Sequence, residues 1–228
     1  MKIIDAHSHI DYISHNFQED VVGTICCATN ESDWDKLIDI MQNDKNVYSA
    51  FGIHPWFVDS VKNGFEERLE TLLKTNRNFM VGETGLDKYK PDMDKQINIF
   101  QSQLNIAIHL HRSVFLHCVG AWEKILCVLK QYKQKELPII VVHDFNANND
   151  ILDKLLQYKN IYFSLGKNFV YDRLCRIEEI PSDKILIESD ADKNVILTNI
   201  IDKISSVKKE PDIADMIYNN TIKVINNG

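Results

Sequence analysis

Two histidines near the N-terminus, His7 and His9, have a spacing that could bind a metal ion. Residues 2–9 are rich in β-forming side chains, and because side chains alternate along a strand, both imidazoles would point to the same side. A second pair, His109 and His111, ends a segment with helical spacing, where residues two apart diverge by about 200° and cannot hold one ion together. The first pair is therefore the candidate for metal chemistry, and the second is expected to lie at a solvated helix end.

Four further residues of ligand type stand where other β-rich runs end: Glu83, His117, His143 and Asp190. A polar residue commonly ends a strand, so any one of them alone could be structural. Together with the first histidine pair, however, they make four imidazoles and two carboxylates, which suit two divalent cations such as zinc, manganese or magnesium. Two dications repel each other at close range, so an anionic ligand shared between them is needed. Glu83 is the expected bridge.

These residues come together if the β-rich runs form a parallel barrel. Several runs are continuous and apolar, which is typical of parallel strands covered on both faces, and segments with helical spacing at 92–110 and 122–134 lie between them. Eight β/α units in 228 residues predict a single-domain α/β protein, a (β/α)8 TIM barrel over residues 1–228, whose functional groups gather at the C-terminal strand ends. An open doubly wound sheet is the alternative. The predicted strands are 2–9, 23–29, 47–53, 78–83, 113–118, 139–143, 161–165 and 184–189.

Composition and charge narrow the function classes. With 44% hydrophobic and 26% charged residues, the chain has the composition of a globular protein rather than a disordered or fibrous one. It has no apolar run of about 18 residues and no signal peptide, so we expect no membrane span and a cytoplasmic location. No obligate protein partner is expected either. The formal net charge of −7 argues against broad adhesion to nucleic acid, but two bound dications would change it to −3, which is compatible with a nuclease. The scattered cysteines fit no zinc motif and are expected to be reduced thiols: Cys26, Cys27, Cys118, Cys127 and Cys175.

The strand ends also carry a resemblance to a known family. In order along the chain, they match the landmarks of the TatD-related deoxyribonucleases, which are metal-dependent hydrolases with a TIM-barrel fold. The match covers nearly the whole chain, and a glutamate on the fourth strand separates this family from barrel relatives that bridge their metals with a carboxylated lysine. The matching segments are Ile4-Asp5-Ala6-His7-Ser8-His9-Ile10-Asp11, Gly52-Ile53-His54-Pro55, Gly82-Glu83-Thr84-Gly85-Leu86-Asp87, Leu116-His117, Val142-His143-Asp144-Phe145, Glu188-Ser189-Asp190-Ala191 and Asn219-Asn220.

The resemblance implies a ligand set and a reaction. It assigns one metal to His7, His9, Glu83 and Asp190, and the other to Glu83, His117 and His143. It further implies that a hydroxide bridging the metals attacks phosphorus and that Asp190 accepts the proton of the attacking water, so Glu83 and Asp190 are the catalytic candidates. The implied activity is hydrolysis of DNA phosphodiester bonds, often exonucleolytic from a 3′ end.

Substrate contacts are expected from His54, Lys88 and Asp144, which follow the third, fourth and sixth strands. The chain departs from the family pattern at four places. Val119 stands where an arginine is common, Asp144 where a cysteine is familiar and Trp56 where a second histidine is frequent, and the loop after Asp190 is short and poor in basic residues. An apolar residue in place of arginine removes a bidentate phosphate contact. The departures motivate an alternative, a two-metal hydrolase of a small ester, lactone or amide. A barrel that binds a partner without catalysis is a third hypothesis.

Overall fold

The computed structural model describes residues 1–171 and 176–227. Within these residues, eight parallel strands form one sheet in the order β1 to β8, so each strand pairs with the next one along the chain. The predicted TIM barrel is confirmed, and every predicted strand overlaps an observed one. The strands are β1 (Ile3–Ser8), β2 (Val21–Cys27), β3 (Val47–Phe51), β4 (Met80–Asp87), β5 (Val114–Val119), β6 (Ile140–Val142), β7 (Ile161–Leu165) and β8 (Ile185–Ile187).

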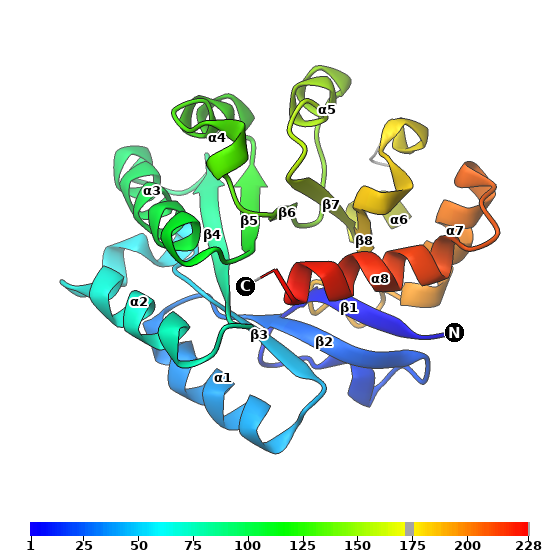
Figure 1. Cartoon of the computed structure of the whole chain (residues 1–228), viewed down its shortest axis with the longest axis horizontal. Helices are drawn as coiled ribbons and strands as arrows, with labels where there is room; N and C mark the ends of the chain where they lie inside the picture. The colour runs from blue at the N-terminus through cyan, green and yellow to red at the C-terminus, as the bar shows by residue number, and fades with distance from the viewer. Residues whose placement is uncertain (172–175, 228) are drawn as a thin grey trace.

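Helices surround the strands (Figure 1). The predicted helix over 92–110 is confirmed as α3, and His111 ends it in a left-handed conformation with φ of 56°. The predicted helix over 122–134 is too long, because α4 ends at Leu129 and the chain turns before a short 3-10 helix at Gln134–Glu136. The helices are α1 (Glu31–Asn43), α2 (Phe65–Thr75), α3 (Met93–Leu110), α4 (Trp122–Leu129), α5 (Asn149–Leu155), α6 (Lys167–Val170), α7 (Leu197–Lys208) and α8 (Ile213–Ile225).

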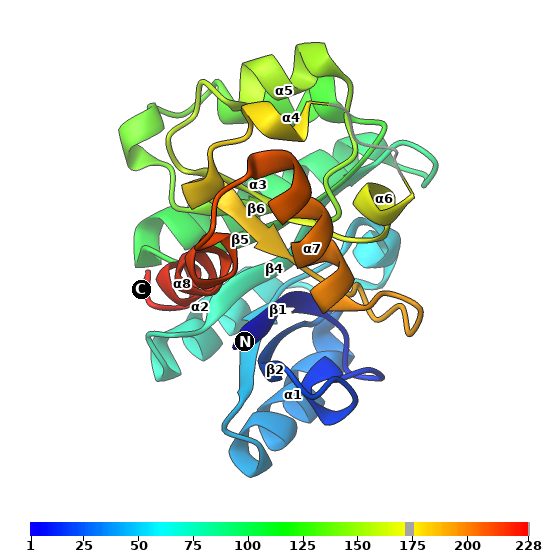
Figure 2. The same ribbon diagram turned by 90° about the vertical axis from the view of Figure 1, so that its right-hand side faces the viewer.

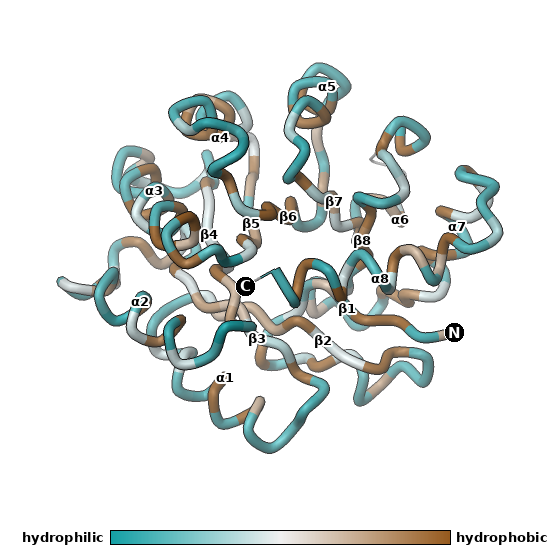
Figure 3. Tube along the Cα trace, viewed as in Figure 1, coloured by the Kyte–Doolittle hydropathy of each residue, from teal (hydrophilic) through white to brown (hydrophobic). Residues whose placement is uncertain are grey.

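Apolar side chains on the inner helix faces pack against the strands. In α3, for example, Phe100 and Leu104 are almost completely buried, as their spacing of four residues predicts for one helix face. Figure 3 shows hydrophobic colouring on the strands and on the helix faces turned toward them, with hydrophilic colouring on the outer turns. This packing covers the outer face of the sheet, and a second cluster of buried side chains from the strands, among them Ile25, Phe115 and Leu186, fills the inside of the barrel.

The barrel is closed by polar contacts at one seam and by α8 at one end. At the seam between β8 and β1, the backbone N–H of Asp190 donates to the carbonyl of His7 at 3.0 Å, and the buried carboxylate of Asp5 accepts from the hydroxyl of Ser189 at 2.6 Å. Burial raises the pKa of Asp5 to about 6. Ser113, just before β5, donates to the carbonyl of Val224 in α8 at 2.7 Å. Figure 2 shows both chain ends on this side, with α6 and the loop after β8 on the other.

Two further expectations concern membranes and cysteines. Among the described residues, no helix combines the length and apolar character needed to cross a bilayer. Cys26, Cys27, Cys118 and Cys127 are free thiols, as predicted, and Cys175 lies outside the described residues.

Candidate metal centre

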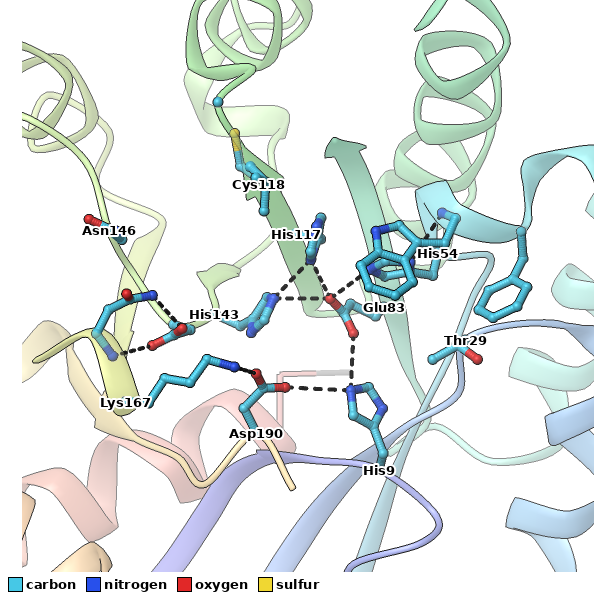
Figure 4. A pocket seen from close by; sticks show the side chains of 16 residues that line it. His9, Thr29, His54, Glu83, His117, Cys118, His143, Asn146, Lys167 and Asp190 are labelled. Atoms are coloured by element: carbon cyan, nitrogen blue, oxygen red, sulfur yellow. Dashed lines mark hydrogen bonds and ion pairs between the residues drawn. The ribbon is translucent and has the colours of Figure 1, made fainter. Parts of the chain in front are cut away.

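The side chains at the end of β1 and after β8 surround one point at the mouth of the barrel (Figure 4). The Nε2 atoms of His7 and His9 lie 3.4 and 3.5 Å from Oε2 of Glu83. The same two atoms lie 3.7 and 3.6 Å from Oδ1 of Asp190. Ligands held 2.0–2.2 Å from one tetrahedral ion are about 3.3–3.6 Å apart, so these four atoms have the spacing of a metal coordination shell.

The other oxygen of Glu83 faces a second group of imidazoles. Its Oε1 lies 2.8 Å from Nδ1 of His117, 3.0 Å from Nε2 of His143 and 3.3 Å from Nε2 of His54. The nitrogens of His117 and His143 are themselves 3.1 Å apart. Glu83 therefore stands between two donor sets with one oxygen directed to each, which is the arrangement expected of a bridging ligand.

Buried nitrogens without hydrogen bonds support a metal at this position. His7 is fully buried, and among the described residues neither of its ring nitrogens has a hydrogen-bond partner; the same is true of Nε2 of His117. Leaving a buried polar atom unsatisfied is unfavourable, which a bound cation would correct at His7 Nε2. Imidazole and carboxylate are also the ligand types that zinc and manganese prefer. The residues present thus fit divalent metal ions.

Hydrogen bonds behind the site fix which ring nitrogen is free to coordinate. The Nδ1 of His9 lies 3.0 Å from the carbonyl of Cys27, which can only accept, so the neutral form of this ring carries its proton on Nδ1 and its lone pair on Nε2. His143 is oriented in the same sense because its Nδ1 lies 3.2 Å from the carboxylate of Glu188. His54 has the opposite tautomer: its Nδ1 accepts the backbone N–H of Trp56 at 3.2 Å, so the neutral ring carries its proton on Nε2. His54 is therefore a hydrogen-bond donor toward Glu83 rather than a ligand.

The pKa values of the two buried carboxyl groups in the centre, Glu83 and Glu188, are shifted in opposite directions. Burial alone would raise the pKa of Glu83, but the surrounding imidazoles hold it well below its usual range. Burial lowers the pKa of His7 to about 4, whereas for His9 the hydrogen bond that its ring donates to Asp190 and the charge of Glu83 outweigh burial and raise the pKa to about 9. The pKa of Glu188, by contrast, is raised by burial to about 7. Glu83 is thus anionic at neutral pH, as a metal-bridging residue must be.

A cavity of about 630 Å³ opens over the two donor sets, which is within the usual range for ligand sites. Lys167, at the start of α6, reaches into it and pairs with Oδ2 of Asp190 at 2.8 Å, which leaves Oδ1 directed to the imidazoles (Figure 4). Lys167 was missed by sequence reasoning, although Gly166 and Lys167 directly follow β7 and could have been found by inspecting that strand end. The cavity is lined by His9, Thr29, His54, Trp56, Phe57, Glu83, His117, Cys118, Val119, Gly120, His143, Asp144, Asn146, Lys167, Asn168 and Asp190.

The three residues predicted to contact substrate have different surroundings. His54 points into the centre, as described above. Asp144 lines the cavity, but its carboxylate accepts from the backbone N–H of Asn168 at 3.1 Å and so holds the turn after β7. The ammonium of Lys88 lies 4.9 Å from the ring centroid of Tyr89, and Lys88 is not among the described residues that line the cavity. A role in substrate binding stays a prediction for all three.

The family model described as TatD related DNase matches residues 4–226, nearly the whole chain. The chain belongs to the TatD-related DNase family. The resemblance based on strand-end residues is thereby confirmed.

Named relatives of this TatD-related chain differ in length. The Yersinia pseudotuberculosis protein named 3′-5′ ssDNA/RNA exonuclease TatD is 30% identical over 154 residues, covering 63% of this chain and 57% of that protein. The human 3′-5′ RNA nuclease TATDN2 is 25% identical over 218 residues, covering 82% of this chain and 28% of the human protein. The match therefore spans less than two thirds of either relative.

Solved structures show the same fold. The crystal structure of Escherichia coli YjjV, described as a TatD homolog, superposes with a TM-score of 0.86 at 22% identity and covers 98% of both chains. A TatD family hydrolase from Entamoeba histolytica gives a TM-score of 0.78 at 16% identity, again covering 98% of both. This TatD-related chain thus has the barrel fold of these structures along almost its full length.

The buried carboxylate of Glu188 is expected to matter for metal affinity. Its Oε1 accepts from the backbone N–H of Asp144 at 2.6 Å and faces Nδ1 of His143 at 3.2 Å, so it orients that imidazole. Glu188→Gln should weaken metal affinity about 10- to 100-fold, because the ring loses its charged partner. Titration calorimetry with zinc or manganese measures the change, and exposed Glu67→Gln is the matched control. Equal affinity in Glu188→Gln and the parent chain would contradict this role.

Proposed function

We propose that this chain hydrolyses phosphodiester bonds of DNA, removing nucleotides from a 3′ end with the help of two divalent metal ions. The observation that carries the proposal is the position of Glu83, whose two oxygens face two separate sets of imidazoles at the floor of a 630 Å³ cavity. The names of the relatives from Yersinia and human, an ssDNA/RNA exonuclease and an RNA nuclease, support a nucleic-acid substrate.

The ligand assignment is part of the proposal. One ion would be held by His7, His9, Glu83 and Asp190, and the other by Glu83, His117 and His143. Bound there, divalent ions would polarise the phosphate and lower the pKa of an attacking water. Asp190 is held ionised by its ion pair with Lys167 at 2.8 Å and by its hydrogen bond with His9. As an ionised carboxylate at the proposed metal centre, Asp190 can accept the proton of that water.

Two side chains supply positive or donor groups for the phosphate. The Nε2–H of His54 projects toward Oε1 of Glu83 at 3.3 Å and can donate to a phosphate oxygen placed beside that carboxylate. Lys167 stands on the opposite wall of the cavity and adds a cation near Asp190. Together they provide phosphate contacts in a site where Val119 occupies the position at which related proteins commonly carry an arginine.

A substrate comparison tests the proposal. The chain is loaded with manganese or zinc and incubated in parallel with end-labelled single-stranded DNA, RNA, and a set of small esters, lactones and amides. We expect stepwise shortening of DNA from its 3′ end that stops on chelation, because the reaction depends on the metals. Turnover of small esters without cleavage of DNA would overturn the proposal in favour of a small-molecule hydrolase, and preference for RNA would correct its substrate.

A further inference from the structure

An aromatic side chain is exposed on the wall of the cavity without a packing role that accounts for it. Trp56 is 54% exposed and its neighbour Phe57 is 36% exposed, whereas Trp34 is only 6% exposed. Single exposed apolar residues are common, but these two are adjacent and both line the same cavity as Glu83. The placement indicates a surface that contacts a ligand.

The indole of Trp56 is held in one orientation. Its Nε1–H donates to Oδ2 of buried Asp87 at 2.7 Å, and the other oxygen of Asp87 accepts the backbone N–H of Tyr89 at 2.8 Å. The ammonium of Lys90 lies 3.9 Å from the indole centroid and covers one face of the ring. Trp56 lines the cavity, whereas Lys90 is not among the described residues that do. A fixed ring loses little conformational freedom when a ligand stacks on it.

The indole also lies at a suitable place relative to the proposed metal centre. Its ring centroid is 5.4 Å from that of His54, and Nε2 of His54 is 3.3 Å from Oε1 of Glu83. One imidazole thus separates the aromatic surface from the bridging carboxylate. A phosphate bound at Glu83 and His54 would place the attached nucleoside beside Trp56.

We propose that Trp56, with Phe57 beside it, is a stacking platform for an unpaired nucleobase next to the scissile phosphate. This inference rests on the proposed nuclease function and names its substrate as a single-stranded end, because a base can lie on the indole only after leaving its neighbours in a duplex. Stacking on an aromatic ring is tolerant of base identity, so the platform favours nucleic acid over small esters without selecting a sequence.

Binding measurements on the full chain test the platform independently of cleavage. The metal-loaded chain is used, hydrolysis is prevented by phosphorothioate linkages at the 3′ end of a 5′-labelled oligothymidylate, and fluorescence anisotropy gives its Kd. Trp56→Ala should raise this Kd about 5- to 150-fold, the range expected for loss of one base stack, while Trp56→Phe should retain most of the affinity. The matched control is Phe17→Ala. Phe17 is 69% exposed and is not among the described residues that line the cavity, so its replacement should leave the Kd unchanged.

A second oligonucleotide separates stacking from a general structural effect. Two copies are made, each abasic at one of the two 3′-terminal nucleotides. Only one of them should bind the parent chain as weakly as Trp56→Ala binds the normal oligonucleotide, and that copy should be insensitive to Trp56→Ala. Three results would overturn the proposal. The first is an equal Kd for Trp56→Ala and the parent chain, the second is an equal loss of affinity of the parent chain for both abasic copies, and the third is no binding of the oligonucleotide by the parent chain. If the metal-loaded chain cleaves DNA and neither binding nor cleavage changes in Trp56→Ala, the stacking proposal fails while the proposed nuclease function stands. If binding depends on the base but normal DNA is not cleaved, the proposed nuclease function fails.

Discussion

Glu83→Gln is expected to reduce kcat/KM on single-stranded DNA by about 10³-fold or more. Glutamine keeps the shape of the side chain but loses the negative charge and one of the two acceptor oxygens. Since Oε2 faces His7 and His9 while Oε1 faces the second imidazole group, both donor sets lose their shared anion. Metal ions contribute several kcal/mol to such reactions, and each 1.36 kcal/mol changes the rate tenfold.

Metal content and activity should fall together in this variant. Elemental analysis after reconstitution measures the metal bound per chain, and steady-state assays on labelled DNA measure the rate. The control is Glu67→Gln, the same substitution at an exposed position of α2, which should leave both quantities unchanged. A Glu83→Gln chain that binds as much metal as its parent and cleaves DNA at the same rate would show that the two donor sets do not form the catalytic centre.

The barrel could be predicted because its strands are continuous apolar runs separated by helical spacing. Strand ends were harder to predict. The fourth strand was expected to stop at Glu83, but β4 continues to Asp87. Gly85 is needed in β4 because β5 approaches it closely, and this approach cannot be seen in the sequence. Helix α4 was expected to continue to residue 134, but it ends at Leu129, where its apolar face also ends.

The candidate site was predicted in its strand-end residues and not in the side chains that orient them. His7, His9, Glu83 and Asp190 meet because parallel strands end at one edge of the barrel, a consequence of topology alone. The pairing of Lys167 with Asp190 depends on the path of the chain after β7, which no spacing rule gives. The fixed indole of Trp56 likewise depends on a contact between segments distant in sequence, because its partner Asp87 lies 31 residues away.

Gly85→Ala is expected to lower the free energy of unfolding by about 3 kcal/mol or more, the second large effect predicted from this structure. Gly85 has φ of 147°, which L-residues with side chains rarely adopt, and a Cβ built on it would lie 1.9 Å from the carbonyl oxygen of His117. Relief of this overlap requires β5 to move away from β4 at a residue of the proposed metal centre. Backbone strain and overpacking of this kind each have a large unfavourable effect on stability.

Gly64→Ala separates the strain of the backbone from the overlap. Gly64 also has a positive φ, 76°, but a Cβ there would meet nothing closer than Nη1 of Arg68 at 3.5 Å, an ordinary contact. Its replacement should therefore cost only about 1 kcal/mol, the penalty of a left-handed conformation. Urea unfolding followed by circular dichroism gives both values. If Gly85→Ala is no more destabilising than Gly64→Ala, β4 and β5 do not approach as closely as described, and the position of His117 beside Glu83 would need revision.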